Sequence, residues 1–347
     1  MSGVAFLPLL FIYVFGLINL IGIRPDLAVR HLIHFVTGSI VFFVIRRLQV
    51  GMQFFRLNAR FIYWTFILLL ILVMFFGLEV KGSRRWFDLY FFQFQPSEFF
   101  KIFFIIFLAD IFAKYDHIRE KRTIFLRVLF YTFLPFILIF RQPDLGSSIV
   151  IFLVAIIMSL HSQLPKKHLL YFFIFIFLLL PAGWFMLHDY QQARIESFLK
   201  PTYDLSGTSY NITQATIAIG SGSMFGRGLG LGKQSSLYFL PEAQTDFAFS
   251  SFIEQFGFLG GFLLIILYLV FFFFLFRKSH HYLNQKDKSG KFYYYYIVRF
   301  YALIITQVAI NIGMNLRLLP IAGITLPFIS YGGSSLLTFI IGLALLP

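Results

Sequence analysis

The sequence predicts an all-α fold, a polytopic integral membrane bundle of about ten transmembrane helices. Of the 347 residues, 59% are hydrophobic and 13% are charged, and the mean hydropathy is +0.81. Soluble domains carry about 25% charged residues, so this composition indicates a chain that lies mostly in lipid. Apolar runs recur along the chain, and a run of about 20 residues crosses the ~30 Å hydrocarbon core as a helix.

Ten such runs define the predicted spans of a single domain over residues 1–347. The first run lacks a basic leader and a small-residue cleavage site, so it is interpreted as a retained helix. The chain ends at Pro347 within the last run, which makes a truncated C-terminus one interpretation. The predicted spans are 4–21, 28–45, 61–78, 97–113, 125–140, 145–161, 168–187, 247–276, 294–316 and 327–347.

Basic residues are concentrated in the loops after the second, fourth, sixth and eighth spans. They include Arg46, Arg47, Arg56, Arg60, Lys114, Arg119, Lys121, Arg122, Arg127, Lys166, Lys167, Arg277, Lys278, Lys286, Lys288 and Lys291. Because Lys and Arg accumulate in cytoplasmic loops, both termini are predicted to be cytoplasmic. The polar segment 188–246 then forms one large extracytoplasmic loop between spans seven and eight.

The formal net charge of +14 therefore reflects the basic loops that set the orientation of the spans in the membrane. Membrane lipid is expected around the bundle, and nucleic acid is not an expected partner. The sequence has no cysteine. Disulfides, thiolate metal sites and cysteine nucleophiles are therefore excluded.

Four polar clusters map to the outer side of this topology. Charged groups at membrane depth are costly and usually face a bundle interior or a wet cavity, where they mark a functional site. The clusters are Arg84-Arg85-Trp86 with Gln95-Pro-Ser-Glu98-x-x-Lys101; Arg141 to Gly146; the loop that ends at Asp246; and Asn311 to Asn315 with Leu326 to Ser335.

Simpler explanations exist for each acid in these clusters. Glu98 and Lys101 are three residues apart, the spacing of a local helical ion pair. Asp144 fits an acid at the positive start of a helix, and Asp246 fits the N-cap of the eighth span. Glu254 lies about two turns further along that span and fits a buried packing partner. The glycines of 226–230 lack the preceding strand and lysine of a phosphate loop, so they are interpreted as turn residues.

The polar motifs occur in an order that resembles the SEDS family of bacterial cell-wall polymerases, and the resemblance spans almost the whole chain. The start of the chain and the 311–314 segment look more like the rod-shape branch, RodA, than the division branch, FtsW. The motifs are Gln95-Pro-Ser-Glu-x-x-Lys101, Gln142-Pro-Asp-Leu-Gly146, Ile217-Ala-Ile-Gly-Ser-Gly222, Phe239-Leu-Pro-Glu-Ala-Gln-Thr-Asp-Phe247 and Leu326-Pro-Phe-Ile-Ser-Tyr-Gly-Gly-Ser-Ser335.

This resemblance implies a peptidoglycan glycosyltransferase that polymerises lipid II at the outer face of the bacterial cytoplasmic membrane for elongation and cell shape. It also implies that Asp246 is the essential acid. The expected partners are lipid II, a class B penicillin-binding protein that acts as the transpeptidase, and other membrane proteins of the elongation complex. Gln244 stands where the family usually has histidine.

The reaction indicates what the site needs. A β-1,4 link made from an α-linked diphosphate donor inverts the sugar carbon, so one carboxylate can serve as the base for the incoming hydroxyl. The leaving diphosphate needs cations, or a divalent ion such as Mg²⁺ or Mn²⁺ held by an acid. Asp246 is the catalytic candidate, and the substrate-binding candidates are Arg84, Arg85, Glu98, Lys101, Asp144, Arg194, Lys233, Glu242, Gln244, Thr245 and Ser330.

Other functions fit parts of the same pattern. A flippase for the lipid-linked precursor would also need many spans and a polar cavity, although no internal repeat typical of transporters is found. A division-type paralogue of the same polymerase and a non-catalytic scaffold of wall synthesis are the remaining alternatives.

Overall fold

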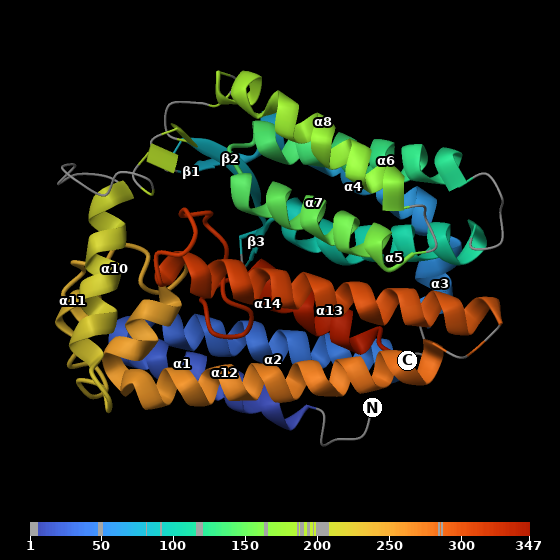
Figure 1. Cartoon of the computed structure of the whole chain (residues 1–347). Helices are drawn as coiled ribbons and strands as arrows, with labels where there is room; N and C mark the ends of the chain where they lie inside the picture. Colours follow the sequence, from blue (N-terminus) through green and yellow to red (C-terminus); the bar gives the residue numbers. More distant parts are fainter. Residues whose placement is uncertain are drawn as a thin grey trace.

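The computed structural model is a bundle of helices that run along one shared direction (Figure 1). Each of the ten predicted spans overlaps with a helix, which confirms a helical membrane fold. The structure describes residues 6–47, 51–80, 82–90, 92–115, 121–162, 166–185, 187, 191–192, 195–196, 198, 208–283, 285 and 287–347. The ten helices are α1 (Leu7–Ile23), α2 (Pro25–Arg47), α4 (Ala59–Phe76), α5 (Pro96–Tyr115), α6 (Lys121–Arg141), α7 (Leu145–Leu160), α8 (Lys166–Trp184), α12 (Ala248–Leu283), α13 (Lys288–Asn315) and α14 (Gly333–Ala344).

Burial separates central helices from peripheral ones. Among the described residues, five helices are long and apolar enough to cross a membrane, and α1, α7 and α14 are shorter apolar helices. The apolar window of α13 is 67% buried inside the protein, whereas that of α2 is 17% buried. Helix α5 carries four charged residues, and its charged side chains at Glu98, Lys101 and Asp110 are buried. We conclude that α13 and α5 form the centre of the bundle and that α2 presents much of its surface to lipid.

A small antiparallel sheet lies at one end of the bundle, where the sequence predicted only a loop. Strands β1 (Leu78–Val80), β2 (Ser83–Asp88) and β3 (Gln93–Phe94) pair in the order β1-β2-β3. Successive side chains of a strand point to opposite faces. The sheet therefore separates the two neighbouring arginines, Arg84 and Arg85, onto different sides of β2.

The last predicted span is helical only over α14, because residues 316–332 take an irregular path. Most of 321–330 is nevertheless buried. Irregular backbone at membrane depth is tolerated only where protein or a water-filled cavity surrounds it. In this segment, the N–H of Leu326 bonds to the Ser330 hydroxyl at 2.8 Å, and the C=O of Ile324 accepts from Asn311 at 2.6 Å. The segment is thus held inside the bundle by side-chain hydrogen bonds.

Helix α12 is 36 residues long and breaks at Gly257, which has φ +71°. The loop after helix α10 (Thr208–Gly222) fills the break. The N–H groups of Phe258 and Leu259 bond to the C=O groups of Ser223 and Met224 at 2.9 and 3.1 Å. A side chain at Gly226 or Gly257 would collide with the backbone of the other segment. The glycines of this loop therefore serve a close backbone contact.

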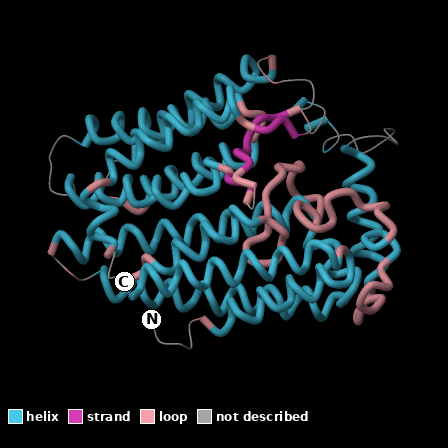
Figure 2. The backbone as a smooth tube through the Cα atoms, turned by 180° about the vertical axis from the view of Figure 1, so that it is seen from behind, coloured by secondary structure: helices cyan, strands magenta, loops and turns pink. Residues whose placement is uncertain are grey.

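Loops are concentrated at the end of the bundle that carries the small sheet (Figure 2). Helix α10 crosses that end at a steep angle to the other helices (Figure 1). Two further short helices are α3 (Met52–Leu57) and α11 (Lys233–Ser236). The segment that was predicted as a large loop therefore contains helical structure of its own.

Candidate active site

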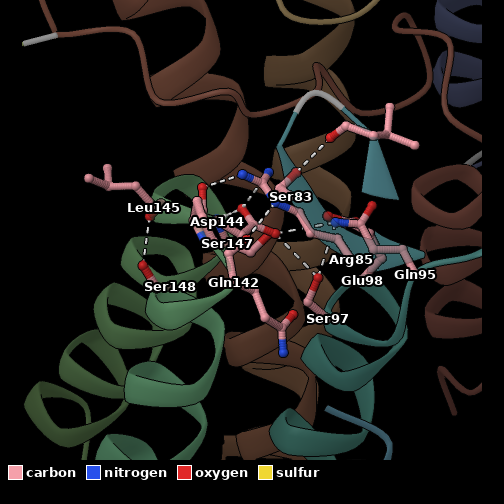
Figure 3. Close-up of polar contacts among 12 residues, drawn as sticks. Ser83, Arg85, Gln95, Ser97, Glu98, Gln142, Asp144, Leu145, Ser147 and Ser148 are labelled. Atoms are coloured by element: carbon pink, nitrogen blue, oxygen red, sulfur yellow. Dashed lines mark hydrogen bonds and ion pairs between the residues drawn. The ribbon is translucent and has the colours of Figure 1, made fainter. Parts of the chain in front are cut away.

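The first group of polar residues is centred on Asp144, at the start of α7. The carboxylate oxygen Oδ1 accepts from the Ser147 N–H at 3.1 Å, so Asp144 is the N-cap of α7. This agrees with the interpretation of Asp144 as an acid at the start of a helix. The other oxygen, Oδ2, accepts from Gln95 Nε2 at 3.2 Å and from the Ser97 hydroxyl at 3.3 Å. We call Arg85, Gln95, Ser97, Asp144 and Ser147 the Asp144 cluster (Figure 3).

Arg85 closes this cluster from the small sheet. Its Nε donates to the Gln142 C=O at 2.8 Å, one Nη donates to the Pro143 C=O, and the other Nη lies 3.9 Å from the Asp144 carboxylate. Arg84 points elsewhere and pairs with Glu79 across the strands at 3.0 Å, in an exposed position. Of the two predicted arginines, the structure brings only Arg85 to the Asp144 cluster.

Glu98 and Lys101 form the ion pair that their spacing predicted, with Nζ and Oε1 2.6 Å apart. Both side chains are buried near the first turn of α5, and Glu98 lies beside Gln95 (Figure 3). The second carboxylate oxygen, Oε2 of Glu98, is buried without a hydrogen-bond partner among the described residues. An unsatisfied buried acceptor is costly, so this oxygen is a candidate contact for a bound hydroxyl.

The second group is the turn 241–247, which we call the Asp246 turn. Three successive main-chain carbonyls are held by other segments. The Gln244 C=O accepts from the Tyr331 N–H at 2.8 Å, and the Thr245 C=O accepts from the Ser330 hydroxyl at 2.6 Å. The Asp246 C=O accepts from the amides of Asn311 and Asn315, both at 3.0 Å. The backbone of the turn is therefore fixed from two directions.

Asn311 and Asn315 lie four residues apart on one face of α13. Besides the contact with Asp246, the Asn315 Oδ1 accepts from the Ser250 hydroxyl at 2.6 Å and from the Ser250 N–H at 3.1 Å. This links the first turn of α12 to the last turn of α13. Because α12 begins at Ala248, Asp246 lies one residue before the N-cap position. Asp246 thus lies next to the start of α12, and its interpretation as a helix cap stays a prediction.

The Asp144 cluster and the Asp246 turn are connected through the irregular segment 316–332. A side chain at Gly146, two residues after Asp144, would collide with the main chain of Ala322. Two residues later in that segment, Ile324 is bonded to Asn311, which also holds Asp246. The Ser334 hydroxyl in turn accepts from the Gln95 N–H at 3.1 Å. The predicted clusters therefore converge at one end of the bundle.

Other candidates take structural positions or lie apart. Within the Asp246 turn, the Glu242 carboxylate accepts from the Thr245 hydroxyl at 2.7 Å. Lys233 is exposed at the start of α11. Arg194 lies outside the described residues. Within the described part of the chain, no group of three or more histidine or acidic side chains could hold a metal ion.

Glu254 and Gln255 hold the loop that leads to the Asp246 turn. The Glu254 carboxylate accepts from the Gln234 and Ser235 N–H groups at 2.8 and 3.0 Å, so it caps α11. Gln255 bonds to Asn19 at 2.6 Å and to the Gly230 N–H at 2.9 Å. Glu254 is thus the buried partner that the sequence predicted.

The sequence argument missed four residues that shape the site. Gln95 and Ser97 were noted only as parts of a motif, and Asn311 and Asn315 only as a polar cluster. The asparagines could have been found from their four-residue spacing in an apolar helix, which places two amides on one face. The Gln95 side chain bonds to Asp144, which lies 49 residues further along the chain. Local sequence does not reveal a contact over that separation.

A family model for cell cycle proteins, named for FtsW, RodA and SpoVE, matches residues 2–347. The chain is 34% identical over 308 residues to a probable peptidoglycan glycosyltransferase FtsW of Hydrogenovibrio crunogenus, with 86% of this chain and 76% of the relative aligned. It is also 34% identical over 352 residues to the peptidoglycan glycosyltransferase MrdB of Helicobacter pylori strain 26695, with 96% and 87% aligned.

The fold is shared with a chain solved in a study of how a peptidoglycan synthase complex coordinates polymerisation and crosslinking. The TM-score is 0.81 at 27% sequence identity, and the match covers 99% of this chain and 95% of that one. The agreement therefore extends over nearly the whole bundle.

Proposed function

Because the chain belongs to the FtsW/RodA/SpoVE family of cell cycle proteins, we propose that it polymerises lipid II into glycan strands with Asp246 as general base. Its activity is that of a peptidoglycan glycosyltransferase, and it is a multi-pass membrane protein. The observation that carries the assignment of Asp246 is the fixed backbone of the Asp246 turn, whose three carbonyls are held by α13 and by residues 330 and 331.

The proposed reaction is a single inverting displacement. The sugar hydroxyl of the acceptor attacks the anomeric carbon of the donor, and the bond from that carbon to the diphosphate oxygen breaks. Asp246 takes the hydroxyl proton, and the polyprenyl diphosphate leaves with the bonding electrons. A base of this kind contributes about 10²- to 10⁴-fold to the rate when it lies within hydrogen-bond reach. The anchored turn supports such placement, because three of its main-chain carbonyls are held by other segments.

Neighbouring groups are assigned to substrate binding. The unsatisfied Oε2 of Glu98 would accept a sugar hydroxyl, and Lys101 would supply positive charge beside it. Arg85 donates its described hydrogen bonds to the C=O groups of Gln142 and Pro143. Its proposed role is therefore to hold the shape of the Asp144 cluster and to add positive potential there. Arg84, Arg194 and Lys233 remain proposed contacts for the diphosphate, as do Glu242, Gln244, Thr245 and Ser330 for the sugar.

The setting proposed for this reaction is the outer face of the cytoplasmic membrane, with both termini cytoplasmic. The charge asymmetry of the loops supports this orientation. The proposed partner is a class B penicillin-binding protein, and the likeness to a chain from a peptidoglycan synthase complex supports an assembly of that kind. A role in elongation is supported by the alignment to the MrdB of Helicobacter pylori, which spans more of both chains than the alignment to the FtsW of Hydrogenovibrio crunogenus.

The test is polymerisation of purified lipid II by the full chain, with and without the partner transpeptidase. Asp246→Asn should lose about 10²-fold or more of the rate while the protein stays folded. Asp26→Asn is a matched control, because this exposed acid pairs locally with Arg24 at 2.7 Å, and it should polymerise at the wild-type rate. Full activity of Asp246→Asn would contradict the role of Asp246, and flipping of lipid II in liposomes without polymerisation would favour the transporter alternative.

A further inference from the structure

Asn19 is a buried polar residue of α1 that has no part in the reaction as described so far. Its side chain is 1% exposed, and α1 carries no charged residue along Leu7–Ile23. Helix α1 packs against α12 (Figure 1). Because a polar side chain in a transmembrane helix is costly unless it has a partner inside the bundle, the contacts of Asn19 indicate its role.

Both ends of the Asn19 amide are bonded to α12. Its Nδ2 donates to the Ser251 hydroxyl oxygen at 3.1 Å, and its Oδ1 accepts from the Gln255 Nε2 at 2.6 Å. Ser251 and Gln255 are four residues apart, so they lie on one face of α12. Asn19 therefore ties α1 to α12 at two points, both of them before the break at Gly257.

Ser251 continues this contact to the Asp246 turn. Its hydroxyl donates to the Ala243 C=O at 2.9 Å, and the Ala248 C=O lies 3.0 Å away as a second acceptor. Ala243 belongs to the Asp246 turn and directly precedes the three carbonyls that other segments hold. A serine hydroxyl has one proton, and because Asn19 donates to the oxygen, that proton is left for the carbonyls. Asn19 is thus two hydrogen bonds away from the Asp246 turn.

The same side of α1 also supports another anchor of the turn. Gly16 lies three residues before Asn19, so the two residues are neighbours on one helix face. A side chain at Gly16 would come within 2.8 Å of the Phe328 C=O oxygen and of the Ile329 Cα. The next residue, Ser330, donates its hydroxyl to a carbonyl of the turn. Helix α1 therefore contacts two of the segments that fix the turn.

We propose that Asn19 is a positioning residue for the polymerisation reaction, which acts through Ser251 on the Ala243 carbonyl and so helps to place Asp246. This rests on the proposed function and adds a residue to it. A shift of the turn would move the base relative to the acceptor hydroxyl, and such misplacement slows the reaction. The other bond of Asn19 leads away from the turn, because Gln255 accepts from the Gly230 N–H at 2.9 Å.

The first test is the polymerisation of lipid II by the full chain with Ser251→Ala, which removes the link but leaves Asn19 in place. We expect kcat to fall about ten-fold, since misplacement by about 1 Å costs on the order of 10²-fold. KM should not change, because the base acts in the transition state. Ser159→Ala is the matched control. It removes a buried helical serine that donates to the Ala155 C=O at 2.9 Å near the far end of α7, and its kcat should equal that of the wild type.

The second test compares Asn19→Leu, Ser251→Ala and the double variant. If Asn19 acts through Ser251, the loss of kcat in the double variant should match the larger of the two single losses, because coupled residues are not additive. Asn19→Leu also releases Gln255, so it should lower the unfolding temperature more than Ser251→Ala does. If Asn19→Leu does not fold, the comparison of Ser251→Ala with Ser159→Ala still decides the matter.

A wild-type kcat in Ser251→Ala would overturn the proposal, and so would equal losses of kcat in Ser251→Ala and Ser159→Ala. A double variant whose loss is the product of the two single losses would show that Asn19 does not act through Ser251. The same assay separates this proposal from the proposed function. If the wild type polymerises lipid II and Asp246→Asn does not, a normal Ser251→Ala protein overturns only the role of Asn19. If the wild type does not polymerise lipid II, both proposals fail.

Discussion

Asp144 and Asp246 are two acids at one end of the bundle that the structure holds in different ways. Asp144 is 3% exposed, and its two carboxylate oxygens accept from Gln95, Ser97 and Ser147. Asp246 is half-buried, and its described hydrogen bonds fix its main-chain carbonyl. A carboxylate that accepts from several donors stabilises the structure, and a turn whose backbone is anchored keeps its side chains in a defined position. The comparison supports the proposal that Asp144 acts mainly in stability and Asp246 in catalysis.

The largest expected loss of stability follows Asp144→Ala. Removal of this carboxylate leaves the half-buried Arg85 guanidinium without its acidic neighbour, and it also removes the N-cap of α7. Breaking a buried pair costs about 3–5 kcal/mol, and we expect a loss of that order in the free energy of unfolding. Thermal unfolding in detergent measures it.

A double variant sharpens this prediction. Arg85→Ala/Asp144→Ala removes both charges, so it should be less destabilised than the sum of the two single variants. Strict additivity would show that Arg85 and Asp144 are not coupled, although their charged atoms lie 3.9 Å apart.

Asn315→Leu should have the next largest effect. The substitution removes one anchor of the Asp246 carbonyl and leaves the buried N–H of Ser250 without its acceptor. Unsatisfied buried groups cost about 1–3 kcal/mol each, so we expect a loss of roughly 2–4 kcal/mol. Displacement of the turn by about 1 Å would also lower the polymerisation rate by ~10². A variant that is as active as the wild type would show that Asn311, Ser330 and Tyr331 fix the turn without Asn315.

Glu254→Gln should have a smaller effect. The glutamine keeps one oxygen for the cap of α11 but loses the charge-assisted bonds to the Gln234 and Ser235 N–H groups. Loss of a cap costs about 1 kcal/mol, and we expect a destabilisation of this size with a polymerisation rate near that of the wild type. Complete inactivity of a folded Glu254→Gln protein would place Glu254 in the reaction itself.

Arg84→Gln should have the smallest effect on stability. Its pair with Glu79 is exposed on both sides, and exposed ion pairs contribute about 0–1 kcal/mol. A rise in KM for lipid II with an unchanged unfolding temperature would support a diphosphate contact. A loss of stability comparable to that of Asp144→Ala would contradict the placement of Arg84 and Arg85 on opposite sides of β2.

Much of the fold could be predicted from the sequence because hydropathy determines which segments enter lipid. The ten apolar runs became helices, and the Glu98–Lys101 pair followed from helical spacing. The small sheet was missed because its strands are short and mix polar with apolar residues. The break at Gly257 was missed because the run 247–276 is apolar over most of its length, and nothing local indicates that residues 223–228 fill the break.

The polar clusters of the candidate site could be predicted from the sequence, but its geometry could not. Topology placed the polar clusters on one side, and they do gather at one end of the bundle. The separation of Arg84 from Arg85 depends on a strand that the sequence did not reveal. The anchoring of Asp246 depends on Asn311 and Asn315, which are 65 and 69 residues away, and such distant contacts follow only from the packing of α12 against α13.

The most direct test of the central claim is the polymerisation rate of Asp246→Asn measured beside that of Asp144→Asn, each per folded molecule. Thermal unfolding of the same samples supplies the folded fraction. The account predicts that Asp246→Asn unfolds at the wild-type temperature and loses about 10²-fold or more of the rate, whereas Asp144→Asn unfolds at a lower temperature and loses less of its rate. An Asp246→Asn protein that polymerises lipid II at the wild-type rate would contradict the account.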